Sequence, residues 1–268
     1  MRNRNLLTYS DCNLRSLMRF PTFKGVLFRS RLLAQGRLEC FNSVVPFVKD
    51  KSGLEIGGPS EVFRRWCSPL PIYPQVTSLD NCDVSRTTIW ATHADAYRFS
   101  KGTVPGKTIF CEGSDLSCVS DQNYDFILSS HNLEHFANPV KALHEWKRVT
   151  RPGGGLVLVL PNHSKTFDHR RSPTTVDHMF EDFERNMQED DLSHLPEILQ
   201  THDLSLDLAA GSAEEFRSRS LNNFTNRCLH HHVFDKTNSR QLLSAVGMDV
   251  LAVEPAFPFH IFLLARMP

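Results

Sequence analysis

The chain has 268 residues, and its 30 Lys and Arg balance its 30 Asp and Glu. This length suits one large α/β domain or one domain with an insertion. The balanced charge gives no overall sign of nucleic-acid binding, and apolar residues at 40% are enough for a substantial core. Seven scattered cysteines without a CxxC pair indicate reduced thiols in a cytoplasmic protein rather than a disulfide framework or a zinc knuckle. No apolar run approaches the roughly 18–20 residues of a membrane span.

The first 38 residues are strongly basic and contain a single acid, Asp11. Apolar residues are interleaved with the basic ones, while Pro21 and Gly25 interrupt the helical pattern. We interpret residues 1–48 as a basic N-terminal arm that lies on the core. A membrane-surface or polyanion contact and an organelle transit peptide are the alternatives for the same composition.

The stretch around which the chain is organised is Gly53–Ser60, read Gly-Leu-Glu-Ile-Gly-Gly-Pro-Ser. It predicts a short strand over 53–56, a turn at Gly57 and Gly58, and a helix over 60–66. Two residues without Cβ let the backbone turn sharply and let a ligand approach the main chain. In an open α/β sheet, ligands bind at such a strand-to-helix turn, although plain turn chemistry explains the same residues.

A second strand is predicted over 75–79, ending in Asp80. This acid follows Glu55 at close to the distance at which dinucleotide-binding folds place a ribose-binding carboxylate. The alternative is that Asp80-Asn81 forms only a turn.

The remaining core pattern alternates apolar strands with amphipathic helices. Asn138-Pro139 is typical of a helix start, because asparagine caps and proline suits the first turn. A continuous apolar run such as 124–128 is typical of a strand buried on both faces. Further strands are predicted over 107–111, 156–160, 248–253 and 259–265, with helices over 37–49 and 234–246.

Six of these motifs together resemble class I S-adenosylmethionine-dependent methyltransferases, closest to the broad small-molecule (type 11-like) subgroup. They are Leu54–Gly58, Asp80, Asp115-Leu116, Tyr124–Leu128, Asn132–His135 and Arg148–Gly154, within residues 53–161. The resemblance implies an α/β, Rossmann-like, seven-stranded and mostly parallel sheet whose last strand is antiparallel. The turn Gly57-Gly58-Pro59 departs from the usual Gly-x-Gly but keeps the close backbone approach.

The resemblance also implies S-adenosylmethionine as the methyl donor and a set of donor-binding residues. Gly57 and Gly58 would contact the amino-acid part of the donor, Asp80 the ribose hydroxyls, and the stretch Glu112–Leu116 the adenine. Glu55 is expected to order the turn and the donor amino group. The cofactor-binding residues implied are Glu55, Gly57, Gly58, Asp80, Asp115, Leu116 and Ser129.

Residues 162–228 interrupt the core, which is assigned to residues 49–161 and 229–268. The insertion is too long for an ordinary connection, and it is acidic and rich in histidine. We interpret it as a helical lid over the substrate, with helices over 175–186 and 213–228. Thr166–Arg171 and Leu229–Asp235 are similar, less specifically, to a bacterial methyltransferase subgroup that modifies glycans or secondary products.

Two histidines are the candidate catalytic residues. His131 follows a strand end where this family places substrate-facing groups, and its ordinary pKa suits a base. His163 follows the next strand, whereas His135 is expected to be structural. Arg170 and Arg171 suit a substrate phosphate or carboxylate, or the lid's own acids.

A divalent metal in the lid is the alternative to plain hydrogen bonding between the lid and a polyol. The residues with ligand chemistry are Asp168, His169, His178, Glu181 and Asp182. We expect hydrogen bonding rather than a metal.

These features predict an enzyme that O-methylates a hydroxyl of a small molecule or glycan, because the polar lid suits polyol recognition. The alternatives are an N-methyltransferase and a non-catalytic binding or assembly protein that retains the fold, since fold does not imply function. An RNA substrate is disfavoured because the lid is acidic.

Overall fold

The computed structural model describes residues 30–31, 34–64, 68–88, 92–100, 103–207 and 209–268. The predicted basic arm therefore lies outside the described residues up to residue 29. Its last part is described, and there helix α3 (Phe41–Val48) packs Phe41, Val44 and Val48 into the core.

The centre of the fold is an eight-stranded sheet in the order β3-β4-β2-β1-β5-β6-β8-β7. The pairs between β4, β2, β1, β5 and β6 are parallel, whereas β8 is antiparallel to both β6 and β7. This confirms the Rossmann-like, mostly parallel sheet with an antiparallel last strand. The strands are β1 Ser52–Ile56, β2 Ser78–Asp83, β3 Ala96–Tyr97, β4 Gly106–Phe110, β5 Tyr124–Ser130, β6 Thr150–Pro161, β7 Asp249–Ala256 and β8 His260–Arg266.

The eighth strand is β3, a two-residue edge strand antiparallel to β4. It is too short to produce a readable alternation in the sequence, which explains why seven strands were expected.

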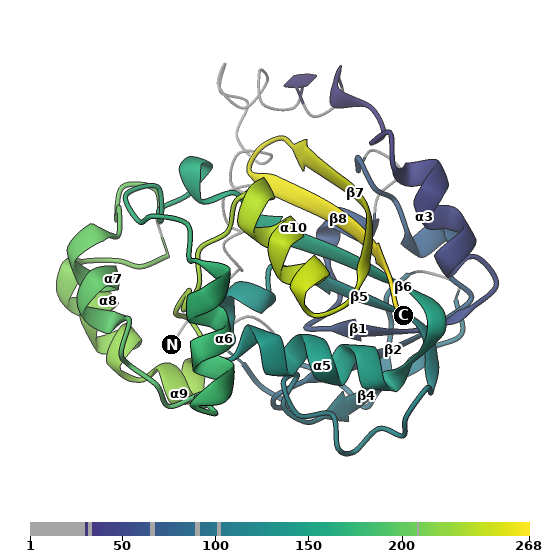
Figure 1. The fold of residues 1–268 in the computed structure, drawn as a ribbon, viewed down its shortest axis with the longest axis horizontal. Coiled ribbons are helices and arrows are strands. Elements are labelled where there is room, and N and C mark those ends of the chain that lie inside the picture. Colours follow the sequence, from purple (N-terminus) through teal and green to yellow (C-terminus); the bar gives the residue numbers. More distant parts are fainter. Residues whose placement is uncertain (1–29, 32–33, 65–67, 89–91, 101–102, 208) are drawn as a thin grey trace, which may run out of the picture.

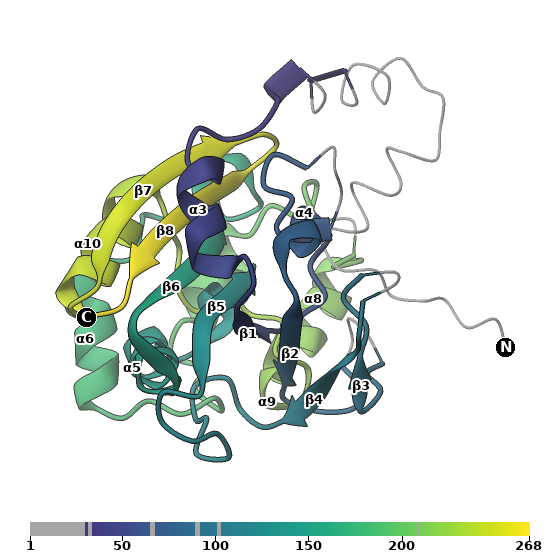
Figure 2. The ribbon, with the colours of Figure 1, turned by 90° about the vertical axis from the view of Figure 1, so that its right-hand side faces the viewer.

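Helices cover both faces of the sheet (Figures 1 and 2). One apolar core joins α5 and α10 to alternate residues of the central strands, and a second core joins α3 to the residues between them. In β6, for example, Leu156 and Leu158 belong to the first core and Val157 and Val159 to the second, as the two-residue period of a strand requires. The helices are α4 Glu61–Arg64, α5 Pro139–Val149, α6 Val176–Glu184, α7 Leu195–Thr201, α8 Ala213–Leu221, α9 Asn223–Asn226 and α10 Lys236–Ala245, besides α3.

The second parallel strand begins three residues later than the sequence predicted. A 3-10 turn over Tyr73–Gln75, with proline in its first turn, occupies the predicted start, and β2 runs over Ser78–Asp83. Asp80 therefore lies in the middle of the strand, opposite Leu54, and Asp83 is the acid at its carboxyl end.

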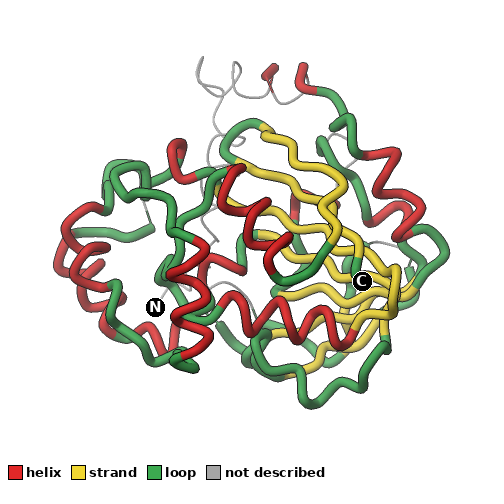
Figure 3. Tube along the Cα trace, in the orientation of Figure 1, coloured by secondary structure: helices red, strands yellow, loops and turns green. Residues whose placement is uncertain are grey.

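The insertion 162–228 carries α6 to α9, and Figure 3 shows α7, α8 and α9 as helices beside the sheet rather than over it. It has a small apolar core of its own. The members of that core are Leu195, Ile198, Ala210, Phe216 and Leu229. Among the described helices, none is both long and apolar enough to cross a membrane.

Candidate active site

The turn after β1 is built around two glycines that tolerate no side chain. Gly57 has φ of +71°, and a Cβ there would overlap the Asn132 amide. A Cβ at Gly58 would overlap the Tyr97 hydroxyl. The two backbone N–H groups are held in place, because Gly57 donates to the Cys82 carbonyl at 2.8 Å and Gly58 to the Asn81 side chain at 2.8 Å.

Glu55 lies beneath this turn and is completely buried. Its carboxylate accepts from the Tyr73 hydroxyl at 2.7 Å, the Tyr97 hydroxyl at 2.5 Å and the Ser60 hydroxyl at 2.7 Å. Burial raises the pKa of Glu55, and these hydrogen bonds oppose that shift. The carboxylate therefore links the turn to the start of α4 and to β3.

The structure corrects which acid stands at the end of the second parallel strand. Asp80 accepts from the Lys107 N–H at 2.9 Å and from the Tyr124 hydroxyl at 2.8 Å. Both carboxylate oxygens therefore accept hydrogen bonds from residues of neighbouring strands. Asp83 instead lies at the carboxyl end of β2, and it pairs with His93 at 2.9 Å with 10% of its side chain exposed. The predicted strand boundary was wrong, and this is why the sequence placed Asp80 at the strand end.

The residues predicted to contact adenine have other partners. Asp115 is exposed and accepts from the Ser117 N–H at 3.2 Å. Leu116 is fully buried, and its N–H donates to Glu145 at 2.8 Å. Asp115 is therefore a surface residue, and the Leu116 N–H is already bonded. Glu112, by contrast, lies just past the end of β4 and pairs with Arg227 of the insertion at 2.9 Å.

Ser129 lies where the sequence predicted, near the carboxyl end of β5 and opposite Ile56 of β1. It is fully buried, and its hydroxyl has no hydrogen-bond partner among the described residues. The Asn81 amide nitrogen, on neighbouring β2, is likewise buried without a partner in the described part of the chain. Such polar groups are rare inside proteins and call for an explanation such as a ligand or water.

His131 follows directly after β5 and adopts a left-handed backbone with φ of +53°. Its Nε2 lies 2.8 Å from Nδ1 of His260, the first residue of β8, and its Nδ1 lies 3.6 Å from Glu134. Both Glu134 carboxylate oxygens are buried without a hydrogen-bond partner in the described residues. Burial raises the pKa of Glu134, but the neighbouring His131, His135 and His230 outweigh burial and lower it. Burial and the charge of His131 hold the pKa of His260 well below its ordinary value.

The other two candidate histidines have different surroundings. His163 begins the 3-10 turn after β6, and its Nδ1 is buried without a hydrogen-bond partner in the described residues. The Nδ1 of His135 lies 2.9 Å from the Leu229 carbonyl, and burial with the charge of His230 lowers the pKa of His135 to about 4. That environment supports the structural role expected of His135.

The basic residues of the insertion bind its own acids or the core. Arg170 pairs with Asp203 at 3.0 Å. Arg171 is buried, donates to the His230 carbonyl at 2.7 Å and lies 3.5 Å from Asp168. Arg227 bridges Glu112 and Glu189, each at 2.9 Å.

Three groups of this site were missed from the sequence. His260 was missed because it lies 129 positions from His131 and no local motif marks it. Asp83 was available as an acid near the predicted strand end, and Glu112 was included only within a stretch.

Solved structures of similar shape include two methyltransferases. A SAM-dependent methyltransferase from Aquifex aeolicus is 12% identical, with 95% of this chain and 98% of that chain covered and a TM-score of 0.46. An S-adenosylmethionine-dependent methyltransferase from Mesorhizobium loti is 14% identical, with 85% and 95% covered and a TM-score of 0.47. Among curated proteins, no sequence matches the chain.

A family model described as a methyltransferase domain matches residues 27–253. The match includes the glycine turn, Asp83, Glu112, His131 and the whole insertion. The chain belongs to this methyltransferase family.

Proposed function

We propose that the protein transfers a methyl group from S-adenosylmethionine to a hydroxyl of a small, polyhydroxylated acceptor, such as a sugar or a glycan end. The family supports the donor and the reaction class. The observation that carries the choice of a hydroxyl is the buried chain of Glu134, His131 and His260 beside the donor turn, because a hydroxyl must lose its proton when it is methylated.

The residues present fit the donor. Gly57 and Gly58 carry no side chains and lie against Asn132 and Tyr97, and Asp83 provides a carboxylate at the end of β2. The hydroxyl of Ser129 and the amide nitrogen of Asn81 are buried polar groups that lack partners in the described residues. When bound, S-adenosylmethionine supplies a methyl group on a positively charged sulfur. Asp83 would hold its ribose, and Glu112 would lie at its adenine.

The histidine pair is the proton acceptor in this proposal. Both ring nitrogens of His131 face partners, Nε2 facing His260 at 2.8 Å and Nδ1 facing Glu134 at 3.6 Å. In this proposal Nε2 of His260 therefore takes the proton of the acceptor, and Nδ1 of His260 passes its own proton to Nε2 of His131. Glu134 stays ionised because the histidines lower its pKa, so it orients His131 and stabilises the protonated ring. General-base catalysis of this kind contributes about 10²–10⁴-fold in rate.

The insertion supports a polar acceptor. We propose that it covers the acceptor side, since Arg227 joins it to Glu112 at the end of β4. The core segment that follows the insertion contacts the loop after β5, where the backbone N–H of His232 donates to the Glu134 carbonyl at 3.3 Å. His163 follows β6, the neighbour of β5. We propose that it binds the acceptor and takes no part in removing the acceptor's proton.

The test is methyl transfer from labelled S-adenosylmethionine to a panel of sugars, phenols and amines. We expect transfer to hydroxyl acceptors, and His131→Ala and His260→Ala should slow turnover at least about 100-fold with donor affinity unchanged. His144→Ala is the matched control, because this ring stacks on Phe183 on the outer side of α5. Transfer only to amines would contradict O-methylation and favour an N-methyltransferase. Donor binding without any transfer would favour the alternative of a non-catalytic binding protein.

A further inference from the structure

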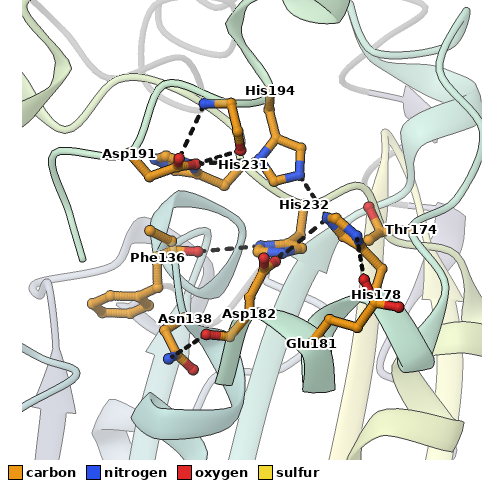
Figure 4. A network of polar contacts seen from close by, with 12 residues as sticks. Phe136, Asn138, Thr174, His178, Glu181, Asp182, Asp191, His194, His231 and His232 are labelled. Atoms are coloured by element: carbon orange, nitrogen blue, oxygen red, sulfur yellow. Dashed lines mark hydrogen bonds and ion pairs between the residues drawn. The ribbon is translucent and has the colours of Figure 1, made fainter. Parts of the chain in front are cut away.

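Four side chains from three separate segments meet at the junction of the insertion and the core (Figure 4). His178 and Asp182 lie one turn apart on α6, His194 precedes α7, and His232 precedes α10. One ligand atom from each lies within 4.8 Å of every other. Together they offer three imidazole nitrogens and one carboxylate oxygen, a donor set that divalent transition metals prefer.

The three shortest spacings among these atoms are close to the edges of a tetrahedron around one ion, and all four atoms lie within 4.8 Å of one another. Metal–ligand bonds of about 2.0–2.1 Å place neighbouring tetrahedral ligands about 3.3–3.4 Å apart. Nε2 of His178 lies 2.8 Å from Nε2 of His194 and 3.4 Å from the Asp182 carboxylate. Nε2 of His232 lies 3.0 Å from the same carboxylate oxygen. Small movements of the His178 ring, which is 38% exposed, would complete the geometry.

The ring of His232 has more acceptors than a neutral imidazole can serve. Its Nδ1 faces the Phe136 carbonyl at 3.2 Å, and its Nε2 faces the Asp182 carboxylate at 3.0 Å. A neutral imidazole carries one N–H, so one of the two contacts would bring together two lone pairs. A cation between Nε2 and the carboxylate makes both contacts favourable.

The outward nitrogens of the three rings face oxygen atoms, as they do around bound metals. Besides the contact from His232 to Phe136, Nδ1 of His178 lies 4.0 Å from Glu181 and Nδ1 of His194 lies 3.7 Å from Asp191. Of these three contacts only that of His232 is a hydrogen bond, and it fixes that ring with Nε2 directed inward. Nδ1 of His194 is buried without a hydrogen-bond partner among the described residues.

We propose that His178, Asp182, His194 and His232 bind one divalent transition metal ion of the Zn²⁺ class. The ion fastens the insertion to the loop after β5, because the backbone N–H of His232 donates to the Glu134 carbonyl and the Asn138 amide donates to the Asp182 carbonyl at 3.2 Å. Four protein ligands close the coordination sphere, which is the pattern of a structural rather than a catalytic site.

This site differs from the candidates that the sequence suggested. Only His178 and Asp182 belong to both sets. Asp168 pairs with His230 at 2.6 Å, and His169 pairs with Asp203 at 3.0 Å. His194 and His232 lie too far from α6 along the sequence for a short motif to reveal them as ligands of the same site.

The test is metal content by mass spectrometry after the purified full-length protein is incubated with Zn²⁺ and dialysed. We expect one ion per chain in the wild type and in His169→Ala, a control that removes an insertion histidine outside the cluster. Asp182→Asn and His194→Ala should lose the ion. Co²⁺ in place of Zn²⁺ should give the intense visible absorption of a tetrahedral site, and a chelator should lower the Tm of the wild type by several degrees.

A second variant guards against simple misfolding. His194→Cys keeps a metal ligand at the same place, so it should bind Co²⁺ and add a thiolate charge-transfer absorption. A folded wild type that retains no ion would overturn the proposal. Equal retention by the wild type, Asp182→Asn and His194→Ala would also overturn it, because the ion would then lie elsewhere.

Discussion

At the residue scale, the donor turn depends on two properties of Gly57 that can be measured separately. Its φ of +71° strains any residue with a side chain, and the Asn132 amide occupies the space where a Cβ would project. Gly153 shares the first property, with φ of +75°, but a Cβ there would meet nothing within 4 Å. Alanine substitutions at Gly57 and at Gly153 therefore separate the effect of backbone strain from the effect of steric overlap.

Gly57→Ala should therefore reduce donor affinity at least about 10-fold and lower the free energy of unfolding by more than Gly153→Ala does. Alanine at a positive φ costs about 1 kcal/mol or more, and only Gly57→Ala adds the overlap with Asn132. Calorimetric donor binding and urea unfolding of both variants test this. Equal effects of the two substitutions on donor binding would show that the space beside Asn132 is unimportant.

The residue scale is also where the sequence was least informative. Gly57 and Gly58 were identified correctly as the turn, because adjacent glycines after a short strand are a local signal. Asp80 alone was considered for the strand end, because a three-residue shift of β2 leaves no local signal in the sequence. Which acid stands at the strand end depends on pairing with β1, and that is a long-range property.

At the element scale, the insertion is joined to the core through a buried ion pair. Asp168 is 2.6 Å from His230 and 3.5 Å from Arg171, and all three side chains are almost completely buried. Burial raises the pKa of Asp168, but His230 and Arg171 outweigh burial and lower it. Burial lowers the pKa of His230, and Asp168 outweighs that and raises it. The Asp168 carboxylate therefore stabilises the charged forms of both Arg171 and His230.

Asp168→Asn should lower the free energy of unfolding by about 3–5 kcal/mol, because removing one partner leaves buried charge uncompensated. Asp203→Asn is the matched control in the same insertion. Asp203 pairs with Arg170 and His169 at the surface, where solvent screens such pairs, so its loss should matter much less. Urea unfolding followed by circular dichroism compares the two. Similar destabilisation by both substitutions would mean that burial does not make the Asp168 ion pair more important for stability than the exposed Asp203 pairs.

Element types were predictable where the pattern was long and regular. The strands over 106–110 and 124–130 and the helix over 139–149 agree with the apolar periodicity. Helix α7, with seven residues, and strand β3, with two, are too short for such a pattern.

At the scale of the whole molecule, buried neutral histidines make stability depend on pH. The pKa of His135 is lowered to about 4 by burial and by the charge of His230, whereas an unfolded chain has histidine pKa values near 6.5. Between these values the unfolded chain binds a proton that the folded chain does not. The free energy of unfolding should therefore fall as the pH falls from about 6.5 to 4, by up to about 1.4 kcal/mol per pH unit for this histidine.

Urea unfolding between pH 7 and 4 should show a smaller decline in His135→Gln than in the wild type. Glutamine does not titrate but keeps a side-chain N–H that can donate toward the Leu229 carbonyl. The same pH dependence in both proteins would show that His135 is not one of the titrating groups.

The arrangement of the whole molecule also explains why the site was only partly predictable. Local motifs indicated the donor turn, His131 and the methyltransferase family. His260 reaches His131 through the sheet, because β6 pairs with both β5 and β8. The Arg227 bridge and the cluster of His178, Asp182, His194 and His232 also combine segments that are distant in the sequence, and they form only when the insertion packs against the core.

The central claim is that the chain binds S-adenosylmethionine at the turn after β1, with Asp83 at its ribose. It is tested most directly by calorimetric titration of S-adenosylmethionine into the wild type, Asp83→Asn and Asp80→Asn, two identical changes three residues apart. We predict micromolar binding by the wild type, a loss of about 10–100-fold in affinity for Asp83→Asn, and nearly unchanged affinity for Asp80→Asn. Absence of binding by the folded wild type, or loss of affinity in Asp80→Asn but not in Asp83→Asn, would contradict the account.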